Sequence, residues 1–278
     1  MMRSCLFILC ALLLAACAGP AATLQKSEIG YSLDTDGGVS PHAATRWNAL
    51  IVATGNEAGV FGHFVSDFSK ALQQTSSLNK LTPMLAIPVD KFPQLLSTDS
   101  NIDKAMARLA PREGEGCLVY LTGHGSPAGI ALSAMPFKPT MPPGRLEKIL
   151  GRCAGHPTIV VVSACYSGVF MKPGIASKER IVFTAADAKH PSFGCSDDTH
   201  YTYFDGCFLD SWKKGGTWQS LAREINACVS RKEAALHALP SSPQFFFGRE
   251  MSNLPLPALK VPDGSSPIAA SQEPPPKP

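Results

Sequence analysis

The sequence TIVVV at residues 158–162 decides the fold, because it reads as a strand buried on both faces. A run of β-branched residues without polar alternation is typical of a parallel sheet that helices cover on both sides. Further apolar runs predict strands at residues 49–53, 84–89, 117–121, 181–183 and 244–247. Apolar residues spaced three and four apart predict helices at residues 63–73, from Ser100 to Leu109, at 145–153 and at 217–236. This alternation of strands and helices predicts an α/β fold with a mostly parallel sheet.

Two of these strands lead into short segments with reactive side chains. The quoted strand is followed by SACYSG at residues 163–168, and the strand at 117–121 by TGHGS at residues 122–126. Ligands of open α/β sheets bind beyond the carboxyl ends of the strands. If these two strands are parallel neighbours, His124 and Cys165 emerge at the same edge, where a thiol nucleophile and an imidazole can act together.

Each half of this pattern also has an ordinary structural explanation. A cysteine after a buried strand is commonly a small core residue, and a lone histidine in a glycine-rich loop is commonly structural. The combination favours chemistry, because both residue types follow strands and glycines flank His124, which lets the backbone approach a substrate closely. The backbone amides of Gly125 and Cys165 are then candidate donors to a developing oxyanion.

The first 16 residues read as a signal peptide. Arg3 precedes an apolar run over residues 6–16 that is too short to span a membrane. The run ends in LAAC at residues 14–17, which resembles a bacterial lipoprotein signal, cleaved before a cysteine that then carries lipid. We therefore expect lipidation of Cys17, a flexible tether over residues 17–45, and a location on the periplasmic side of the bacterial cell envelope, at the outer membrane. The alternative is an ordinary secretory signal followed by a chance cysteine.

Composition bounds the remaining possibilities. With 25 basic and 22 acidic residues among 278, the charge is too balanced for a nucleic-acid-binding protein. No later span of about 20 apolar residues occurs, so we expect membrane attachment through the lipid anchor only. We predict one domain over residues 46–251, followed by a proline-rich, disordered tail over residues 252–278.

Six cysteines lie in the body of the chain, at positions 117, 153, 165, 195, 207 and 228. No CxxC pair occurs, so we expect no zinc site of the usual spacing. If one cysteine stays free for chemistry, at least one more must be unpaired. Cys195 and Cys207 flank a short loop and are candidates to pair with each other. A metal pair at His190 and His200 is conceivable, and two surface histidines are the simpler interpretation.

The sequence resembles the legumain-like cysteine peptidases, family C13 of clan CD. Residues 123–126 and 163–168 are similar to that family's His-Gly and Ala-Cys-x-Ser-Gly motifs, and the 41 positions between His124 and Cys165 are similar to theirs. A third stretch, within residues 184–204, resembles the segment that forms the primary specificity pocket, most closely in a bacterial branch of the family. The resemblance covers roughly residues 47–248.

The resemblance implies a caspase-like fold, a three-layer αβα sandwich with a six-stranded, mostly parallel sheet. It implies a cysteine endopeptidase that needs no cofactor or metal and that takes a peptide or protein substrate. Carried over by position, Cys165 is the nucleophile, His124 positions the scissile bond and protonates the leaving amine, and the Gly125 and Cys165 amides form the oxyanion hole. The substrate-pocket residues that the resemblance implies are Ser163, Ser192 and Asp205.

Several departures from the family pattern alter the expected specificity. Ser163 stands where legumains have an acidic residue, two positions before the nucleophile. The family's Asn and Arg after the first strand would fall near Val60 and Gly62, and neither type is present, although His63 matches a histidine there. The chain reads Asp-Gly from Asp205, where family members read Gly-Asp. We therefore do not expect the family's asparagine specificity to carry over.

Other functions stay open on sequence grounds. An acyl-enzyme at Cys165 can be resolved by an amine as well as by water, so a transpeptidase or transamidase would use the same residues. The departures also fit a non-catalytic caspase-like binding module, a pseudoenzyme that kept the dyad but lost substrate positioning. A scaffold that docks a partner through its proline-rich tail is a third interpretation.

Overall fold

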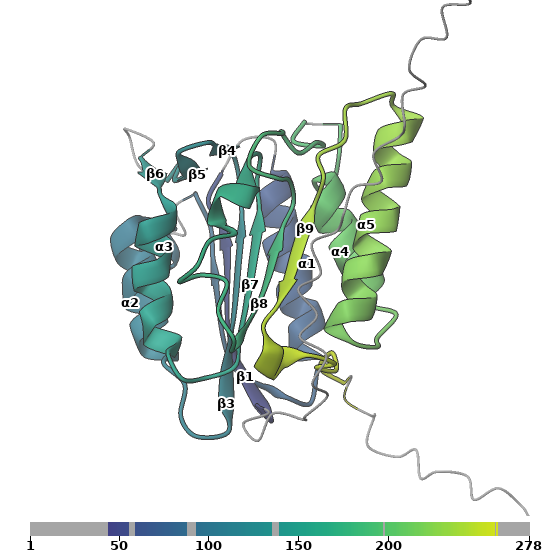
Figure 1. Ribbon diagram of the computed structural model, residues 1–278. Coiled ribbons are helices and arrows are strands. Elements are labelled where there is room, and N and C mark those ends of the chain that lie inside the picture. Colours follow the sequence, from purple (N-terminus) through teal and green to yellow (C-terminus); the bar gives the residue numbers. More distant parts are fainter. Residues whose placement is uncertain are drawn as a thin grey trace, which may run out of the picture.

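A six-stranded sheet between two layers of helices forms the body of the computed structural model, which describes residues 44–55, 59–87, 93–134, 139–196, 198–258 and 260 (Figure 1). Its strands are β1 (Arg46–Ala53), β2 (Leu78–Met84), β3 (Glu115–Thr122), β7 (Thr158–Ser163), β8 (Arg180–Thr184) and β9 (Gln244–Phe247). They lie in the order β2-β1-β3-β7-β8-β9, and among these six β9 alone runs antiparallel to its neighbour. The caspase-like α/β sandwich expected from the sequence is confirmed.

Helices cover both faces of the sheet. One face packs against α1 (Val60–Gln73), α4 (Tyr203–Trp212) and α5 (Trp218–Ala235), and the other against α2 (Asp99–Leu109) and α3 (Pro143–Leu150). Alternate residues of each central strand point to opposite cores: Tyr120 of β3 packs with the first group, and Val119 and Leu121 with the second. A second, three-stranded sheet is formed by β4 (Gly125–Ser126), β5 (Gly129–Ala131) and β6 (Thr140–Met141). Short 3₁₀ turns complete the chain path: η1 (Pro93–Leu95), η2 (Gly151–Cys153), η3 (Ser167–Phe170) and η4 (Arg249–Met251).

The predicted strand at residues 84–89 is wrong. The strand is β2, which ends at Met84 and pairs in parallel with β1. Most of β2 is partly exposed because it lies at the edge of the sheet, and it carries polar residues and Pro83 there. β2 therefore lacks the apolar run that marks the central strands.

Two helical features also differ from the prediction. The N-cap of α2 is Thr98 rather than Ser100, and its side-chain oxygen accepts a hydrogen bond from the Asn101 amide at 3.2 Å. Helix α4 was not predicted from the sequence, because its buried residues surround the helix instead of forming one stripe.

The cysteines divide into two disulfides and two free thiols among the described residues. Cys117 pairs with Cys153 and Cys207 with Cys228, while Cys165 and Cys195 are free. The candidate pairing of Cys195 with Cys207 is therefore wrong. Cys207 is buried in α4, against α5, and Cys228 of that helix is its partner.

The two ends of the sequence lie largely outside the described residues. The predicted signal peptide, Cys17 and almost all of the predicted tether belong to that part. The predicted tail begins as ordered chain: Leu256 is buried, and its amide donates to the Gly216 carbonyl at 2.8 Å. Among the residues that the structure describes, no helix is both long and apolar enough to cross a membrane.

Candidate active site

The carboxyl ends of β3 and β7 lie side by side and in register. Thr122 pairs with Ser163 as the last partners of the two parallel strands, and the Gly123 amide donates to the Ser163 carbonyl at 3.1 Å. His124 and Cys165 each follow two residues after their member of that pair. The prediction that both residues emerge at one edge of the sheet is confirmed, and both are partly exposed there.

Glycine is required on either side of His124, because nearby atoms of the same chain leave no room for a Cβ atom. A Cβ atom at Gly125 would lie 2.1 Å from the Cys165 carbonyl oxygen, and one at Gly123 would lie 2.0 Å from Oγ1 of Thr54. The two glycines therefore allow the histidine loop to pack directly on the loop of Cys165 and on the end of β1. From the sequence, we expected these glycines to let a substrate approach the backbone closely. In the structure, the neighbouring loops make that close approach.

The backbone N–H of Gly125 makes no hydrogen bond within the β4–β5 ladder. Gly125 opposes Ile130, and the Ala131 amide donates to the His124 carbonyl at 2.8 Å. This pattern makes Gly125 and Ile130 a non-hydrogen-bonded pair of the antiparallel ladder. The Gly125 N–H therefore takes no part in the β4–β5 pairing, while its backbone lies against Cys165.

Cys165 precedes a strained turn. Tyr166 has φ 57°, a left-handed conformation that is costly for an aromatic residue, and η3 begins directly after it. The Tyr166 amide donates to the His190 carbonyl at 2.9 Å, which helps to hold this conformation. Strain of this kind is concentrated at functional sites, where the surrounding structure fixes one residue in place.

Ser192 contacts the sulfur of Cys165. The Ser192 amide donates to Sγ at 3.3 Å, and its Oγ lies 3.7 Å from Sγ. The thiol in turn reaches the Ser192 carbonyl at 3.5 Å. These contacts fix where the sulfur lies, and they bring one of the three predicted pocket residues to the reactive atom.

Of the two free thiols, Cys195 lies in buried surroundings. Burial, followed by the nearby charges of Cys165 and Asp205, raises the pKa of Cys195 to about 12. A thiol with such a pKa stays protonated near neutral pH and reacts poorly as a nucleophile. Cys165 is therefore the candidate nucleophile of the two.

His124 is held by packing from α1. The Phe61 ring meets the His124 ring edge-on, with 5.2 Å between the ring centroids. Phe61 is itself fully buried, so it offers a fixed surface to the imidazole. The plane of the histidine thus depends on the first turn of α1 as well as on its own loop.

A buried carboxylate lies beneath this edge. Asp205 has no exposed surface, and its carboxylate accepts hydrogen bonds from the Tyr120 hydroxyl at 2.7 Å and the Thr122 hydroxyl at 2.6 Å. The backbone amide of Asp205 donates a hydrogen bond to Oγ1 of Thr202, the N-cap of α4, at 3.0 Å. Burial raises the pKa of Asp205, although hydrogen bonds from Thr122, Tyr120, Ser163 and Thr202 act in the opposite direction. The network connects β3, β7 and α4 directly under the reactive residues.

The predicted pocket residues therefore occupy different positions. Ser192 lies at the sulfur, whereas Ser163 and Asp205 are buried and belong to the network below it. A carboxylate without exposed surface cannot touch a substrate in this conformation. Sequence reasoning missed Tyr120, Thr122 and Thr202 as partners of Asp205; the capping threonine three positions before Asp205 was the one available signal.

The histidines suggested as a metal pair have separate surroundings. His190 Nδ1 lies 2.8 Å from the Asp187 carboxylate, whereas the His200 ring stacks on His63 with 4.5 Å between centroids. No group of three or more His, Cys, Asp or Glu side chains suited to a metal occurs in the part of the chain that the structure describes.

Comparison with known proteins agrees with the fold. A model of the peptidase C13 family matches residues 84–227, which include His124, Cys165 and Asp205. Among similar solved structures is a crystal structure of a Geobacter sulfurreducens protein, with a TM-score of 0.50 and 15% identity, over 77% of this chain and 100% of that one. At that identity the likeness shows the fold alone. No curated protein sequence matches the chain.

Proposed function

The chain belongs to the peptidase C13 family, and on that premise we propose that it is a lipid-anchored cysteine endopeptidase of the cell envelope. The observation that supports this activity best is the register of β3 and β7. It sets His124 and Cys165 two residues beyond one strand pair, with Gly125 packed on the Cys165 carbonyl. Family membership supports a peptidase that acts on a peptide or protein; the dyad chemistry, the specificity and the anchoring are our proposals.

In the first step of the proposed reaction, the Cys165 sulfur attacks the carbonyl carbon of the scissile bond. The carbonyl π electrons move to oxygen, and the Gly125 and Cys165 amides donate hydrogen bonds to that oxyanion. The C–N bond then breaks as the carbonyl re-forms. His124 delivers a proton to the leaving nitrogen and receives the proton that the thiol loses, so an amine leaves and a thioester remains.

In the second step, a water molecule attacks the thioester. The C–S bond breaks, the carboxylic acid leaves, and one proton of the water returns to the sulfur. If an amine attacks in place of water, the product is a new amide and the enzyme is a transpeptidase. Both outcomes use the same residues, so the acceptor decides between them.

Asp205 acts in this proposal as a positioning residue. It does not reach the reacting atoms, but it binds Thr122, two residues before His124, and belongs to the same buried network as Ser163, two residues before Cys165. Ser192 helps to position the sulfur through the hydrogen bond that its amide donates to Sγ. Asp205 is therefore a buried support of the site rather than a charged group in the substrate pocket. The lack of that charge in the pocket fits an altered preference for the residue before the cleaved bond.

A peptide library digest tests the proposal. The purified protein is incubated with peptides from a digested proteome, and the products are identified by mass spectrometry beside those from Cys165→Ala and Cys195→Ala. We expect new termini, or ligated peptides if an amine is the acceptor, with the wild type and Cys195→Ala. Identical products from the wild type and Cys165→Ala would contradict the proposed activity and favour a pseudoenzyme.

Lipid anchoring has its own test. We expect Cys17→Ala to move the protein from the membrane fraction to the soluble fraction of the producing bacterium, because acyl chains on Cys17 are the proposed attachment. Cys10→Ala, a change within the same predicted signal segment, serves as the matched control. Membrane association that persists in Cys17→Ala would contradict the anchor.

A further inference from the structure

The loop that follows β8 places a further histidine, His190, at the reactive edge. In the sheet order β3-β7-β8, His124 follows β3, Cys165 follows β7, and residues 185–192 follow β8. Residues 185–192, the β8 loop, therefore lie beside Cys165 on the side away from His124. The proposed reaction uses the imidazole of His124 and leaves that of His190 without a role.

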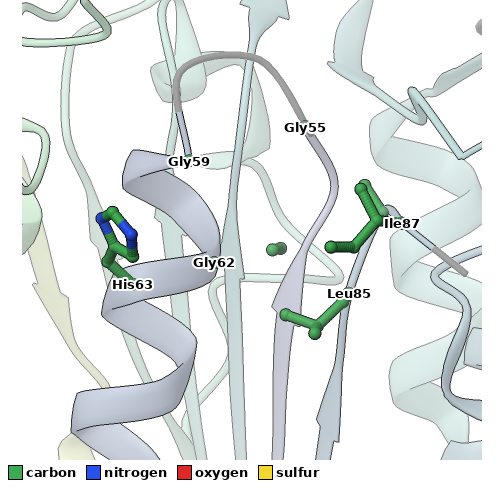
Figure 2. Close-up of a pocket in the computed structure, with 8 residues that line it drawn as sticks. Gly55, Gly59, Gly62, His63, Leu85 and Ile87 are labelled. Carbon is green, nitrogen blue, oxygen red and sulfur yellow. The ribbon is translucent and has the colours of Figure 1, made fainter. Parts of the chain in front are cut away.

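The histidines around this edge differ in what holds their rings. Figure 2 shows His63 on α1, where it lines an apolar pocket, and its ring stacks on that of His200. His190 instead has its Nδ1 atom 2.8 Å from both oxygens of the Asp187 carboxylate. A carboxylate only accepts hydrogen bonds, so Nδ1 carries a proton in the neutral imidazole as in the charged one. The pair therefore persists in both protonation states of His190.

Asp187 also fixes the backbone of the β8 loop. Its carboxylate accepts hydrogen bonds from the amides of Lys189 at 2.7 Å and of His190 at 2.9 Å, and its own amide donates to the Ser241 carbonyl at 3.0 Å. Burial acts to raise the pKa of Asp187, but the hydrogen bonds from Lys189 and His190 lower it below its usual value. The carboxylate is therefore charged near neutral pH, and it binds both the backbone and the side chain of His190.

The β8 loop packs directly on the segment that follows Cys165. The Ala186 amide donates to Oγ of Ser167 at 3.1 Å. A Cβ atom at Gly168 would lie 2.4 Å from the backbone nitrogen of Ala188. The two segments are thus in backbone contact, with no space for a side chain between them.

The peptide unit between Cys165 and Tyr166 is held from two directions. Its N–H, which belongs to Tyr166, donates to the His190 carbonyl at 2.9 Å. Its carbonyl, which belongs to Cys165, lies against Gly125, where a Cβ atom would approach the oxygen to 2.1 Å. The N–H and C=O groups of a trans peptide point in opposite directions. This one unit therefore connects the β8 loop to the loop of His124.

We propose that Asp187 and His190 are positioning residues for the oxyanion hole, an inference that rests on the proposed peptidase function. Their side chains hold the His190 carbonyl in place, and that carbonyl fixes the peptide unit after Cys165. The unit in turn sets the position of the Cys165 amide relative to the Gly125 amide, the two proposed donors. Proton transfer stays with His124.

Two substitutions of His190 separate positioning from proton transfer. The side-chain nitrogen of asparagine occupies the place of Nδ1, so His190→Asn keeps a donor to Asp187 but cannot transfer a proton, whereas His190→Ala loses both. On the best substrate from the library digest, we expect His190→Ala to lower kcat by about 10- to 100-fold with KM within about threefold of the wild type. We expect His190→Asn to keep kcat within about threefold.

His156→Ala is the matched control. His156 is also partly buried, and its Nδ1 atom lies 3.2 Å from the Glu115 carbonyl, at the other end of β3. We expect this substitution to leave kcat unchanged. Equal losses of kcat in His190→Ala and His190→Asn would overturn the positioning role. Wild-type kcat in His190→Ala, with cleavage that still depends on Cys165, would overturn this inference alone and leave the peptidase function in place.

A peptide aldehyde with the acyl half of the same substrate tests the oxyanion hole itself. The Cys165 sulfur adds to the aldehyde carbon, and the thiol proton passes to the aldehyde oxygen, which occupies the hole. We expect the inhibition constant to rise in His190→Ala by about the factor by which kcat falls, and to stay within about threefold in His190→Asn. A fall in kcat with an unchanged inhibition constant would contradict a role at the oxyanion hole.

Hydrogen exchange keeps the inference testable if no peptide is cleaved, a result that would contradict the peptidase function itself. Mass spectrometry follows deuterium uptake at the Tyr166 amide, which donates to the His190 carbonyl. We expect this amide to exchange at least about tenfold faster in His190→Ala than in the wild type, and at the wild-type rate in His190→Asn. Equal rates in all three proteins would overturn the positioning role without reference to turnover.

Discussion

The two ends of β3 each bury a carboxylate, and the two carboxylates have opposite surroundings. At the amino end, Glu115 accepts hydrogen bonds from the Asn48 and Asn79 side chains and from the Arg112 amide, and it pairs with Arg46. At the carboxyl end, Asp205 accepts hydrogen bonds from hydroxyl groups of Tyr120 and Thr122.

The pKa values of the two groups reflect this difference. The hydrogen bond from Arg112 contributes most to lowering the pKa of Glu115, against the effect of burial. Burial is the dominant cause at Asp205 and raises its pKa. The amino end therefore carries a carboxylate that stabilises the fold when charged. The carboxyl end retains one that is costly to charge, which is typical of the functional edge of a sheet.

Substitution of the nucleophile should have the largest effect on the carboxyl end. Cys165→Ser changes little volume, so the melting temperature should stay close to that of the wild type, while turnover falls by at least about 10³-fold because a hydroxyl is the weaker nucleophile. Cys195→Ser, at the other free thiol, should keep turnover within a few-fold. Both variants are assayed on the best substrate from the library digest, and retained activity in Cys165→Ser would break the assignment.

Removal of the carboxylate at the amino end should act on stability alone. Glu115→Ala removes one of the two acceptors of each of the Asn48 and Asn79 side-chain amides and should cost about 3 kcal/mol in the free energy of unfolding. Chemical denaturation measures this loss, with exposed Glu113→Ala as the control. The folded variant should retain wild-type kcat; a large fall in kcat would contradict a purely structural role for this end.

Asp205→Asn should have a smaller effect, on kcat. The substitution weakens the network that holds Thr122 and Ser163, so kcat should fall by about tenfold with little change in KM. Asp210→Asn lies in the same helix with its side chain 73% exposed, and it should leave both constants unchanged. Equal kinetic effects of the two substitutions would remove the positioning role from Asp205.

The smallest effects should appear as opposite pH dependences of stability. Because the folded-state pKa of Glu115 is lowered, its contribution is present above pH 4.5 and is lost as the pH falls. Because the folded-state pKa of Asp205 is raised above 3.8, its contribution is present at lower pH and is lost as the pH rises through the folded-state value.

Denaturation of Glu115→Gln and Asp205→Asn between pH 4 and pH 8 separates the two carboxylates. The stability advantage of the wild type over Glu115→Gln should shrink towards pH 4. Asp205→Asn should gain stability relative to the wild type towards pH 8. Parallel profiles for the two variants would show that the ends of β3 do not differ as described.

The sequence predicted the central strands and the shared edge, because buried parallel strands are continuous apolar runs and the reactive segments follow them directly. It failed at β2, whose polar residues lie at an edge, and at α4, which is buried around most of its surface. Local pattern is informative where an element has one buried face or two. It is weak where tertiary position decides burial.

The residues that support the site were harder to predict from the sequence than the reactive residues. Asp205 was predicted as a pocket residue, but its burial depends on Tyr120 and Thr122, which lie more than 80 positions away in the chain. The disulfide of Cys207 likewise depends on how α4 packs on α5. Contacts between elements distant in sequence leave no local signal, so these partners emerge only from the fold.

The most direct test of the central claim compares two leaving groups in one acyl sequence. A peptide amide and the matching peptide thioester are hydrolysed by the wild type, Cys165→Ala and His124→Ala. An amine must be protonated to leave, whereas a thiolate leaves without a proton. The account predicts that Cys165→Ala loses both activities, and that His124→Ala loses about 10²- to 10⁴-fold on the amide but much less on the thioester. Equal losses on both substrates in His124→Ala, or turnover that survives in Cys165→Ala, would contradict it.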